Sequence, residues 1–307
     1  MSDWPSIAIR FGLYLTMSSL FGLSAFSLYG LSGGERGNAL AFRAWLIASA
    51  ALSLLFSFAW FASMTSSMAE VPLWPIDWEA FGAMLTGNTI ATAWKIRMAA
   101  LALAMFAAIA GSRRGTMTIV AIAAGVALST LPWTGHGAMD EGTAGWMHLA
   151  ADILHLIASG AWVGALIALI LLVSRPAARV DASHLTLTHR ALHGFGAVGT
   201  IVVATIVITG LVNSWFLVGI DKVGTLATNF YGQLLLAKLA LFAAMLGLAS
   251  LNRFKLTPKF EQSIAVEDHH SALASLRLSL LVEIGCIVAI LGLVAWLGIL
   301  APPASAM

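Results

Sequence analysis

The sequence predicts an all-α membrane protein, a polytopic bundle of about eight transmembrane helices. Hydrophobic residues make up 60% of its 307 positions and charged residues 10%, whereas soluble domains carry about 25% charged residues. The mean hydropathy is +0.91. Basic and acidic connections also alternate along the chain, as in proteins that cross a bilayer repeatedly. The net charge of +2 and the lack of a basic patch argue against a nucleic-acid partner and leave the lipid bilayer as the expected surrounding.

Each apolar run is close to the roughly 20 residues that a spanning helix needs. Backbone groups in lipid must be satisfied within the segment, so these runs are expected to be helices. They are predicted at residues 7–29, 42–64, 92–110, 117–133, 147–173, 195–218, 231–251 and 278–300. The longest connection, residues 65–91, contains prolines and aromatic residues and is expected to form an interfacial cap over the outer mouth of the bundle.

The chain is predicted to consist of two four-helix membrane halves, residues 1–133 and 134–307. Residues 88–97 (NTIATAWKIR) align without gaps to residues 229–238 (NFYGQLLLAK), and each segment leads into an Ala/Leu-rich run. This match predicts a possible 4+4 repeat. The alternative is that the two segments share hydrophobicity and nothing more.

Loop charges predict the orientation, because cytoplasmic loops carry the excess of Lys and Arg. The basic connections contain Arg36, Arg43, Arg113, Arg114, Arg175, Arg179, Arg190, Arg253, Lys255, Lys259 and Arg277. Both termini and the loop around His136 are then expected in the periplasm of a bacterium, with the chain in the inner membrane as a multi-pass protein. Tryptophans near the predicted outer ends resemble an interfacial aromatic belt.

A polar stripe runs along the fifth apolar run. His148, Asp152 and His155 fall within roughly 60° of one another on a helix. Gly160 and Gly164 lie more than about 100° away, on a face smooth enough for close helix packing. Ionisable residues within a span usually face a bundle interior or a cavity, so the stripe is expected to line a site that opens outward.

The residue types around this stripe favour a metal. Neutral imidazole binds copper and zinc, and thioether sulfur favours Cu(I). His148 and His155 are about 10 Å apart along a helix axis, so we expect two successive stations, with His136, Met139 or Met147 completing the upper one. Asp152 is expected to orient an imidazole or to pair with a cation.

Two further thioethers, Met64 and Met68, are spaced i,i+4 at the outer end of the second run and are candidate ligands. The alternative readings are structural. A histidine at the edge of a span is often an interfacial residue, and methionines often fill gaps in a core.

Other charged residues lie inside predicted spans. Lys238 is expected either to extend toward the outer surface or to pair with Asp152. For Arg97, extension outward and a place inside the bundle are both left open. Glu283 is expected to find a partner other than Lys238, or water. His189 and His193 have i,i+4 spacing on the cytoplasmic side, which predicts either a metal exit site or solvated histidines.

Three segments resemble a known family: the GHG turn at residues 135–137, the run from His148 to Gly164, and YGQLLLAKLALFAAMLGLASLNRFKL at residues 231–256. They look like the CopD/PcoD family of bacterial inner-membrane copper resistance and homeostasis proteins. The resemblance implies an eight-span protein that carries copper ions from periplasm to cytoplasm and receives them from a periplasmic copper-binding protein. Family members often have two glycines after the Trp-X pair, whereas this chain has Ala165 at the second position.

The sequence therefore predicts a copper transporter and no enzymatic activity. It lacks the GxxxxGK[ST] nucleotide-binding motif, so ATP-driven pumping by this chain is not expected. One alternative is a membrane haem or quinone redox protein, although the membrane histidines fall on a single helix. Another is a copper-binding scaffold or sensor that does not transport.

Overall fold

A computed structural model describes residues 4–32, 35, 42–134, 142–176, 181–265 and 270–305. Helices and no strands occur in these ranges. The long helices are α1 (Trp4–Tyr29), α3 (Phe42–Met68), α5 (Thr89–Ala110), α6 (Arg114–Ser129), α7 (Gly142–Val173), α8 (Ala182–Val218), α9 (Phe230–Leu251) and α11 (His270–Leu297). Within the described ranges, seven helices are long and apolar enough to cross a membrane, and α6 is a shorter apolar helix of 16 residues. The prediction of an all-α polytopic bundle is confirmed, with one helix for each predicted apolar run.

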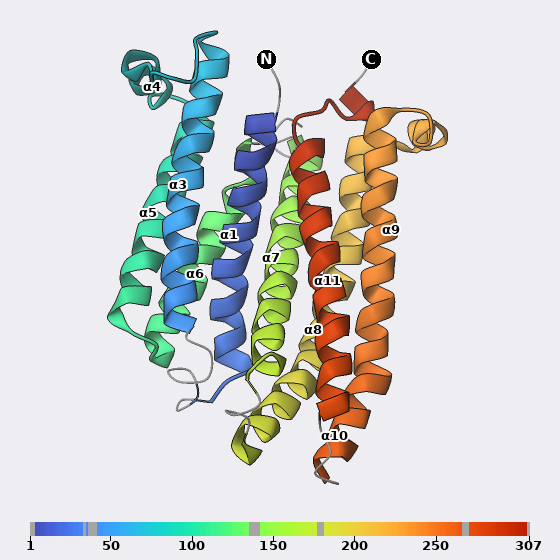
Figure 1. Ribbon diagram of the computed structural model, residues 1–307. Helices are drawn as coiled ribbons and strands as arrows, with labels where there is room; N and C mark the ends of the chain where they lie inside the picture. The colour runs from blue at the N-terminus through green and yellow to red at the C-terminus, as the bar shows by residue number, and fades with distance from the viewer. Residues whose placement is uncertain are drawn as a thin grey trace.

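The helices run up and down between two ends of the bundle (Figure 1). The start of α1 and the end of α11 lie at one end, here called the terminal end. The turn from α5 to α6, which carries Arg113 and Arg114, lies at the opposite end together with α10 (Thr257–Ala265), and this end is called the basic end. The orientation of these two ends in the membrane remains a prediction.

The central helix is α1, which packs against α3, α6, α7 and α11. Its closest approach is to α7, where a Cβ atom on Gly164 would overlap the backbone of Gly22. A Cβ atom on Gly22 would in turn overlap the backbone at Gly160. The predicted close-packing face of α7, which carries Gly160 and Gly164, is therefore confirmed, and it packs against α1. Small residues let the two backbones touch, which supplies the van der Waals contact on which helix association in lipid depends.

The short helix α4 (Trp78–Met84) begins at its N-cap Asp77, whose side chain accepts a hydrogen bond from the backbone N–H of Ala80 at 3.0 Å. Its residue Phe81 packs edge-to-face against Phe61 of α3, with 5.0 Å between the ring centroids. This contact holds α4 over α3 at the terminal end (Figure 1). The connection thus packs on α3 at the terminal end, and the expectation that it caps an outer mouth of the bundle stays a prediction.

At the basic end, α8 begins at Ala182 rather than near residue 195. Asp181 caps its start by accepting a hydrogen bond from the N–H of His184 at 2.7 Å. His184 is buried, and its Nε2 lies 3.0 Å from the carbonyl oxygen of Leu172. It is therefore a structural residue of the α7–α8 connection.

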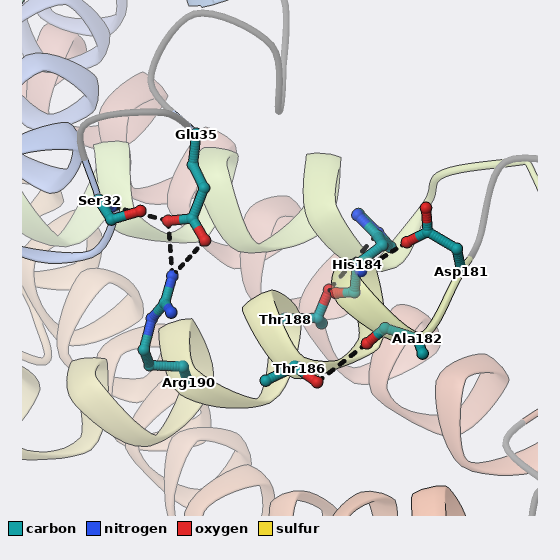
Figure 2. A network of polar contacts seen from close by, with 8 residues as sticks. All are labelled: Ser32, Glu35, Asp181, Ala182, His184, Thr186, Thr188 and Arg190. Atoms are coloured by element: carbon teal, nitrogen blue, oxygen red, sulfur yellow. Dashed lines mark hydrogen bonds and ion pairs between the residues drawn. The ribbon is translucent and has the colours of Figure 1, made fainter.

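A second polar contact at this end joins the first connection of the chain to α8. Arg190 donates to both carboxylate oxygens of Glu35 at 2.5 Å, and the backbone N–H of Ser32 donates to the same carboxylate at 2.7 Å (Figure 2). Partial burial would raise the pKa of Glu35, but the hydrogen bonds from Ser32 and Arg190 outweigh it and hold this pKa below its usual value. Glu35 is thus a charged link between the two halves of the chain.

Candidate functional site

The polar stripe of α7 faces α8, and its members pair with side chains of that helix. The Nδ2 group of Asn213 donates a hydrogen bond to Oδ1 of Asp152 at 2.6 Å. One turn further along α7, Nδ1 of His155 lies 3.0 Å from Oγ1 of Thr209. Because the helices are antiparallel, successive turns of α7 meet successive turns of α8 in reverse order. The stripe is therefore held in place by a matching polar stripe.

His148 occupies the terminal end of this contact. Its ring stacks on Phe216 of α8 with 4.7 Å between centroids and an angle of 6°. Its Nε2 atom lies 4.0 Å from Oδ2 of Asp152, one turn away on α7. His148 is 1% exposed. It therefore packs against Asp152 inside the protein and does not line an open space.

The hydrogen bonds around His155 assign its tautomer. The single hydroxyl proton of Thr209 is donated to the carbonyl oxygen of Thr205 at 2.6 Å, which leaves the hydroxyl oxygen as an acceptor toward His155. The Nδ1 atom of His155 must then carry the ring proton, and Nε2 keeps its lone pair. A neutral imidazole fixed in this way is the form that binds a metal ion.

A cavity of ≈ 190 Å³ lies beside these residues. Its polar lining consists of Arg10 and Tyr14 of α1, Asp152 and His155 of α7, Asn213 and Ser214 of α8, and Tyr231 and Lys238 of α9. Arg10 is close to the start of α1, and Leu297, another lining residue, ends α11. The cavity therefore lies in the half of the bundle next to the terminal end and is called the terminal cavity.

Two polar groups that line the terminal cavity lack an interaction that they could make. The Oδ1 atom of Asn213 is buried and accepts no hydrogen bond within the described structure. Lys238 is half-buried and lines the cavity with Asp152, yet no ion pair within 4.0 Å joins these two residues. An amide oxygen that accepts no hydrogen bond, beside a carboxylate that forms no ion pair with the nearby lysine, suits a site that takes a cationic ligand.

The other predicted ligands lie elsewhere. The side chains of Met147 and Met68 are exposed, at 58% and 63%, and Met64 packs against the hydrophobic core. His136 and Met139 fall outside the residues that the structure describes. Across the described ranges, no three His, Cys, Asp or Glu side chains gather closely enough to hold a metal without other donors. Asn213, whose amide oxygen is such a donor, is therefore the important addition to the predicted set.

Two of the remaining charged residues behave differently from each other. Arg97 is fully buried and does not extend outward, because the hydroxyl and carbonyl oxygens of Thr130 accept its hydrogen bonds at 2.8 and 3.1 Å. Glu283 accepts a hydrogen bond from the side chain of Asn252. The expectation that Glu283 has a partner other than Lys238 is thus confirmed.

At the basic end, His189 lies 3.6 Å from a carboxylate oxygen of Glu261, and its ring centroid is 6.2 Å from that of His193. His193 is exposed. His189 is half-buried with its Nε2 atom shielded from solvent, and Glu261 is exposed. The idea of a metal exit site here remains a prediction.

Sequence reasoning missed the contribution of α8. Thr209, Asn213 and Phe216 are spaced by four and three residues, which places them on one face of a helix. That periodicity can be detected in the sequence. It predicts a contact with the polar stripe only if α8 is known to pack against α7, and the sequence alone does not show which helices pack together.

Comparison with known proteins agrees with the resemblance noted in the sequence. The family model "Copper resistance protein D-like, N-terminal domain" matches residues 1–146, and "Copper resistance protein D" matches residues 189–297. Copper resistance protein D of Pseudomonas syringae pv. tomato is 44% identical over 306 residues, which is 98% of either chain. No solved structure matches the chain.

Two partial relatives share shorter segments. Copper transport protein CutJ of Bacillus subtilis (strain 168) is 36% identical over 128 residues, covering 41% of this chain and 22% of that protein. Inner membrane protein YebZ of Escherichia coli (strain K12) is 28% identical over 132 residues, covering 43% of each. With its apolar helices, the chain is a multi-pass protein of the inner membrane. The near full-length match to the Pseudomonas protein places it in the copper resistance protein D family.

Proposed function

We propose that this protein carries copper across the inner membrane, from periplasm to cytoplasm, and that the terminal cavity is where copper binds on entry. The observation that carries the proposal is the arrangement of His155, Asp152 and Asn213 around one cavity in the terminal half of the bundle. An imidazole nitrogen with a free lone pair, a carboxylate and an amide oxygen with no donor form a mixed nitrogen and oxygen site for a copper ion.

Lys238 gives the site a means of release. In the empty protein its ammonium group shares the cavity with Asp152 and compensates the carboxylate, since an isolated charge within a span is costly. When copper arrives, the same ammonium repels it. Transport requires binding that is favourable enough for entry and weak enough for exit, and a fixed positive charge in the site serves the second requirement.

The direction follows from the loop charges. Cations concentrate in the connections of the basic end, which predicts that this end is cytoplasmic and that the terminal cavity opens toward the periplasm. A periplasmic copper-binding protein is the proposed donor. The Bacillus relative, which is named a copper transport protein, supports transport in preference to an enzymatic role.

Uptake of copper into proteoliposomes tests the proposal. The wild-type protein is expected to accelerate uptake over protein-free vesicles, and His155→Ala and Asp152→Asn to reduce the rate at least about 10-fold, the lower limit for loss of a supporting ligand interaction. His193→Ala is the matched control, because this histidine is exposed at the basic end. Unchanged uptake in both cavity variants would place the entry site elsewhere.

The same preparation separates the alternatives. A copper-binding scaffold or sensor binds copper without uptake. A haem protein shows a Soret band in the absorption spectrum of the purified protein. The membrane histidines His148 and His155 both lie on α7, whereas bis-histidine haem binding takes ligands from facing helices, so we expect no such band.

A further inference from the structure

A second cavity, of ≈ 310 Å³, lies between α7, α8, α9 and α11. Its lining includes Leu192, near the start of α8, and Ser250, near the end of α9. It therefore occupies the half of the bundle next to the basic end and is called the basic cavity. The copper proposal gives it no role.

Three buried polar side chains line the basic cavity. Glu283 is 1% exposed, Trp162 is 2% exposed and Asn252 is 8% exposed. The Nδ2 group of Asn252 donates to Glu283, but its Oδ1 atom accepts no hydrogen bond, and Nε1 of Trp162 donates none within the described residues. Buried polar atoms in native proteins are normally paired, so a donor and an acceptor left open in the lining of one cavity indicate an occupant that offers both.

Local backbone geometry brings Asn252 to the carboxylate. The residues Asn252–Leu256 form a π-helical turn, η5, between α9 and α10. A π-helical turn holds one more residue than an α-helical turn and shifts the side chains that follow, and such turns are frequent at functional sites. Here the turn places Asn252 against Glu283 of α11 and Arg253 at the same cavity.

The chemistry of this lining does not suit copper. The described residues around the basic cavity include no imidazole, thiolate or thioether, which are the groups that hold copper in proteins most firmly. The indole N–H of Trp162 and the guanidinium of Arg253 would both face a metal cation unfavourably. Water can accept from the indole and donate to the amide oxygen, so water fits the open positions.

Few charged side chains lie near Glu283. Arg253 is the charged side chain that lines the basic cavity with it, and this residue also donates to Oγ1 of Thr200. On α11 itself, Arg277 lies at the basic end and donates to the carbonyl oxygen of Val173 at 2.8 Å. The other charged or titratable groups on helices that pack against α11 lie farther away. At the terminal cavity these are Arg10 on α1, Asp152 and His155 on α7, and Lys238 on α9. At the basic end they are Lys259 and Glu261 on α10.

The two cavities follow the same group of helices. On α7, His155 lines the terminal cavity and Trp162 the basic one, a separation of about 10 Å along the axis. The buried apolar residues Ile206 of α8 and Ile287 of α11 lie at positions between the two sets of lining residues. From the terminal end to the basic end, these helices thus carry the proposed copper site, then an apolar layer, and then the buried carboxyl group of Glu283.

We propose that Glu283 is a proton-binding site that exchanges with water at the basic end, and that this proton drives copper transport. On release, the O–H bond of the carboxylic acid breaks, both of its electrons stay on the carboxylate, and the proton passes to cavity water. The carboxylate is then held by the N–H of Asn252, and nothing is oxidised or reduced. The coupling rests on the proposed transport function, whereas the proton site stands on the geometry of the basic cavity.

Infrared difference spectroscopy of the purified, copper-free protein tests the site itself. A carboxylic acid band that disappears as pH rises is expected in the wild type and is expected to be missing in Glu283→Gln. Glu261→Gln, which alters an exposed acid at the same end, is the control and should keep the band. If Glu283→Gln does not fold, Trp162→Phe removes the indole donor and should shift the midpoint of the band. A wild-type protein without such a band, or one whose band responds to sodium and not to pH, contradicts the proposal.

Proteoliposomes test the coupling. Copper uptake by the wild type should change with an imposed pH gradient, and uptake by Glu283→Gln should not, while copper affinity at the terminal cavity stays at the wild-type value. If wild-type vesicles take up no copper, the transport function fails and the infrared result still decides the proton site. Uptake that ignores the gradient in the wild type overturns the coupling alone.

Discussion

Arg97, which is buried, and Lys238, which is half-buried, are two cations in comparable positions with different surroundings. Each lies nine residues after an asparagine that caps the start of its helix. Asn88 accepts from the N–H of Ala91 at 2.6 Å, and Asn229 accepts from the N–H of Gly232 at 2.6 Å. The two helices, α5 and α9, therefore begin in the same way, and the comparison isolates what surrounds the cation. Whether the halves are true repeats remains a prediction.

The first cation is buried and held by hydrogen bonds from two of its three guanidinium nitrogens, whereas its buried Nη1 donates none within the described residues. Thr130 ends α6, and its hydroxyl and carbonyl oxygens accept from Arg97, whose guanidinium also lies 5.3 Å from the ring centroid of Trp60. The carbonyl groups at a helix end need such donors. In the N-terminal half the cation is thus a packing element.

The second cation faces open space. Lys238 lines the terminal cavity with Asp152 and His155, and no hydrogen bond within the described structure holds its ammonium group. The same distance from the start of a helix therefore does not give the two cations the same role. The decisive difference is whether neighbouring helices close around it, as α6 does, or leave a cavity.

The largest expected effect comes from the contact that joins the two sides of the bundle. Gly164→Leu should prevent α1 from approaching α7, because even a Cβ atom overlaps the Gly22 backbone. We expect the peak of the folded protein in size-exclusion chromatography to be lost. Gly247→Leu on α9 is the control, since no atom lies within 4 Å of a Cβ there. Normal folding of the Gly164 variant would mean that the two helices are not in close contact.

The second-largest effect is expected from replacing the two cations, Arg97 and Lys238, by alanine. Arg97→Ala leaves a cavity and an unpaired Thr130 carbonyl, so the free energy of unfolding should fall by about 2–4 kcal/mol. Lys238→Ala should cost about 1 kcal/mol or less, because the side chain already faces a cavity, but it should change copper affinity and uptake. Thermal unfolding and copper titration of both variants measure this. Equal destabilisation by the two substitutions would remove the distinction between them.

The third effect concerns Asp152, the acidic residue that lines the terminal cavity with Lys238. Asp152→Asn should weaken copper binding about 10- to 100-fold, the scale for a residue that supports a metal ligand, and should leave folding intact because the amide can still hydrogen-bond. If Asp152 instead serves as the counter-ion of Lys238, the single variant should unfold at lower temperature and Lys238→Met should restore it. Calorimetry with copper titration separates these outcomes.

The smallest effect lies outside the membrane, at Glu35. Its pKa is lowered in the folded protein, so it stabilises the fold above its unfolded pKa, and this contribution is lost as pH falls through the lowered folded value. Glu35→Gln should abolish that acid-dependent loss, which is at most about 1 kcal/mol for an exposed pair. Unfolding curves at neutral and acid pH provide the test, and identical pH profiles for both proteins would exclude the link to Arg190.

Local periodicity explains what the sequence could predict. The stripe of His148, Asp152 and His155 and the separate glycine face follow from the helical repeat alone, and both are present. The partners on other helices, Gly22 and Asn213, depend on which helices meet, and apolar runs carry little information about that in lipid. The start of α8 was misplaced because hydropathy detects the part of a helix that crosses the membrane and not its extension beyond the bilayer.

Anomalous X-ray diffraction at the copper absorption edge, from copper-loaded crystals, tests the central claim most directly. The account predicts an anomalous peak in the terminal cavity, within bonding distance of His155 and Asp152 and next to the Oδ1 atom of Asn213. The peak should be lost in crystals of His155→Ala and kept in those of His193→Ala. A copper peak at another position, with the terminal cavity empty at saturating copper, would contradict it.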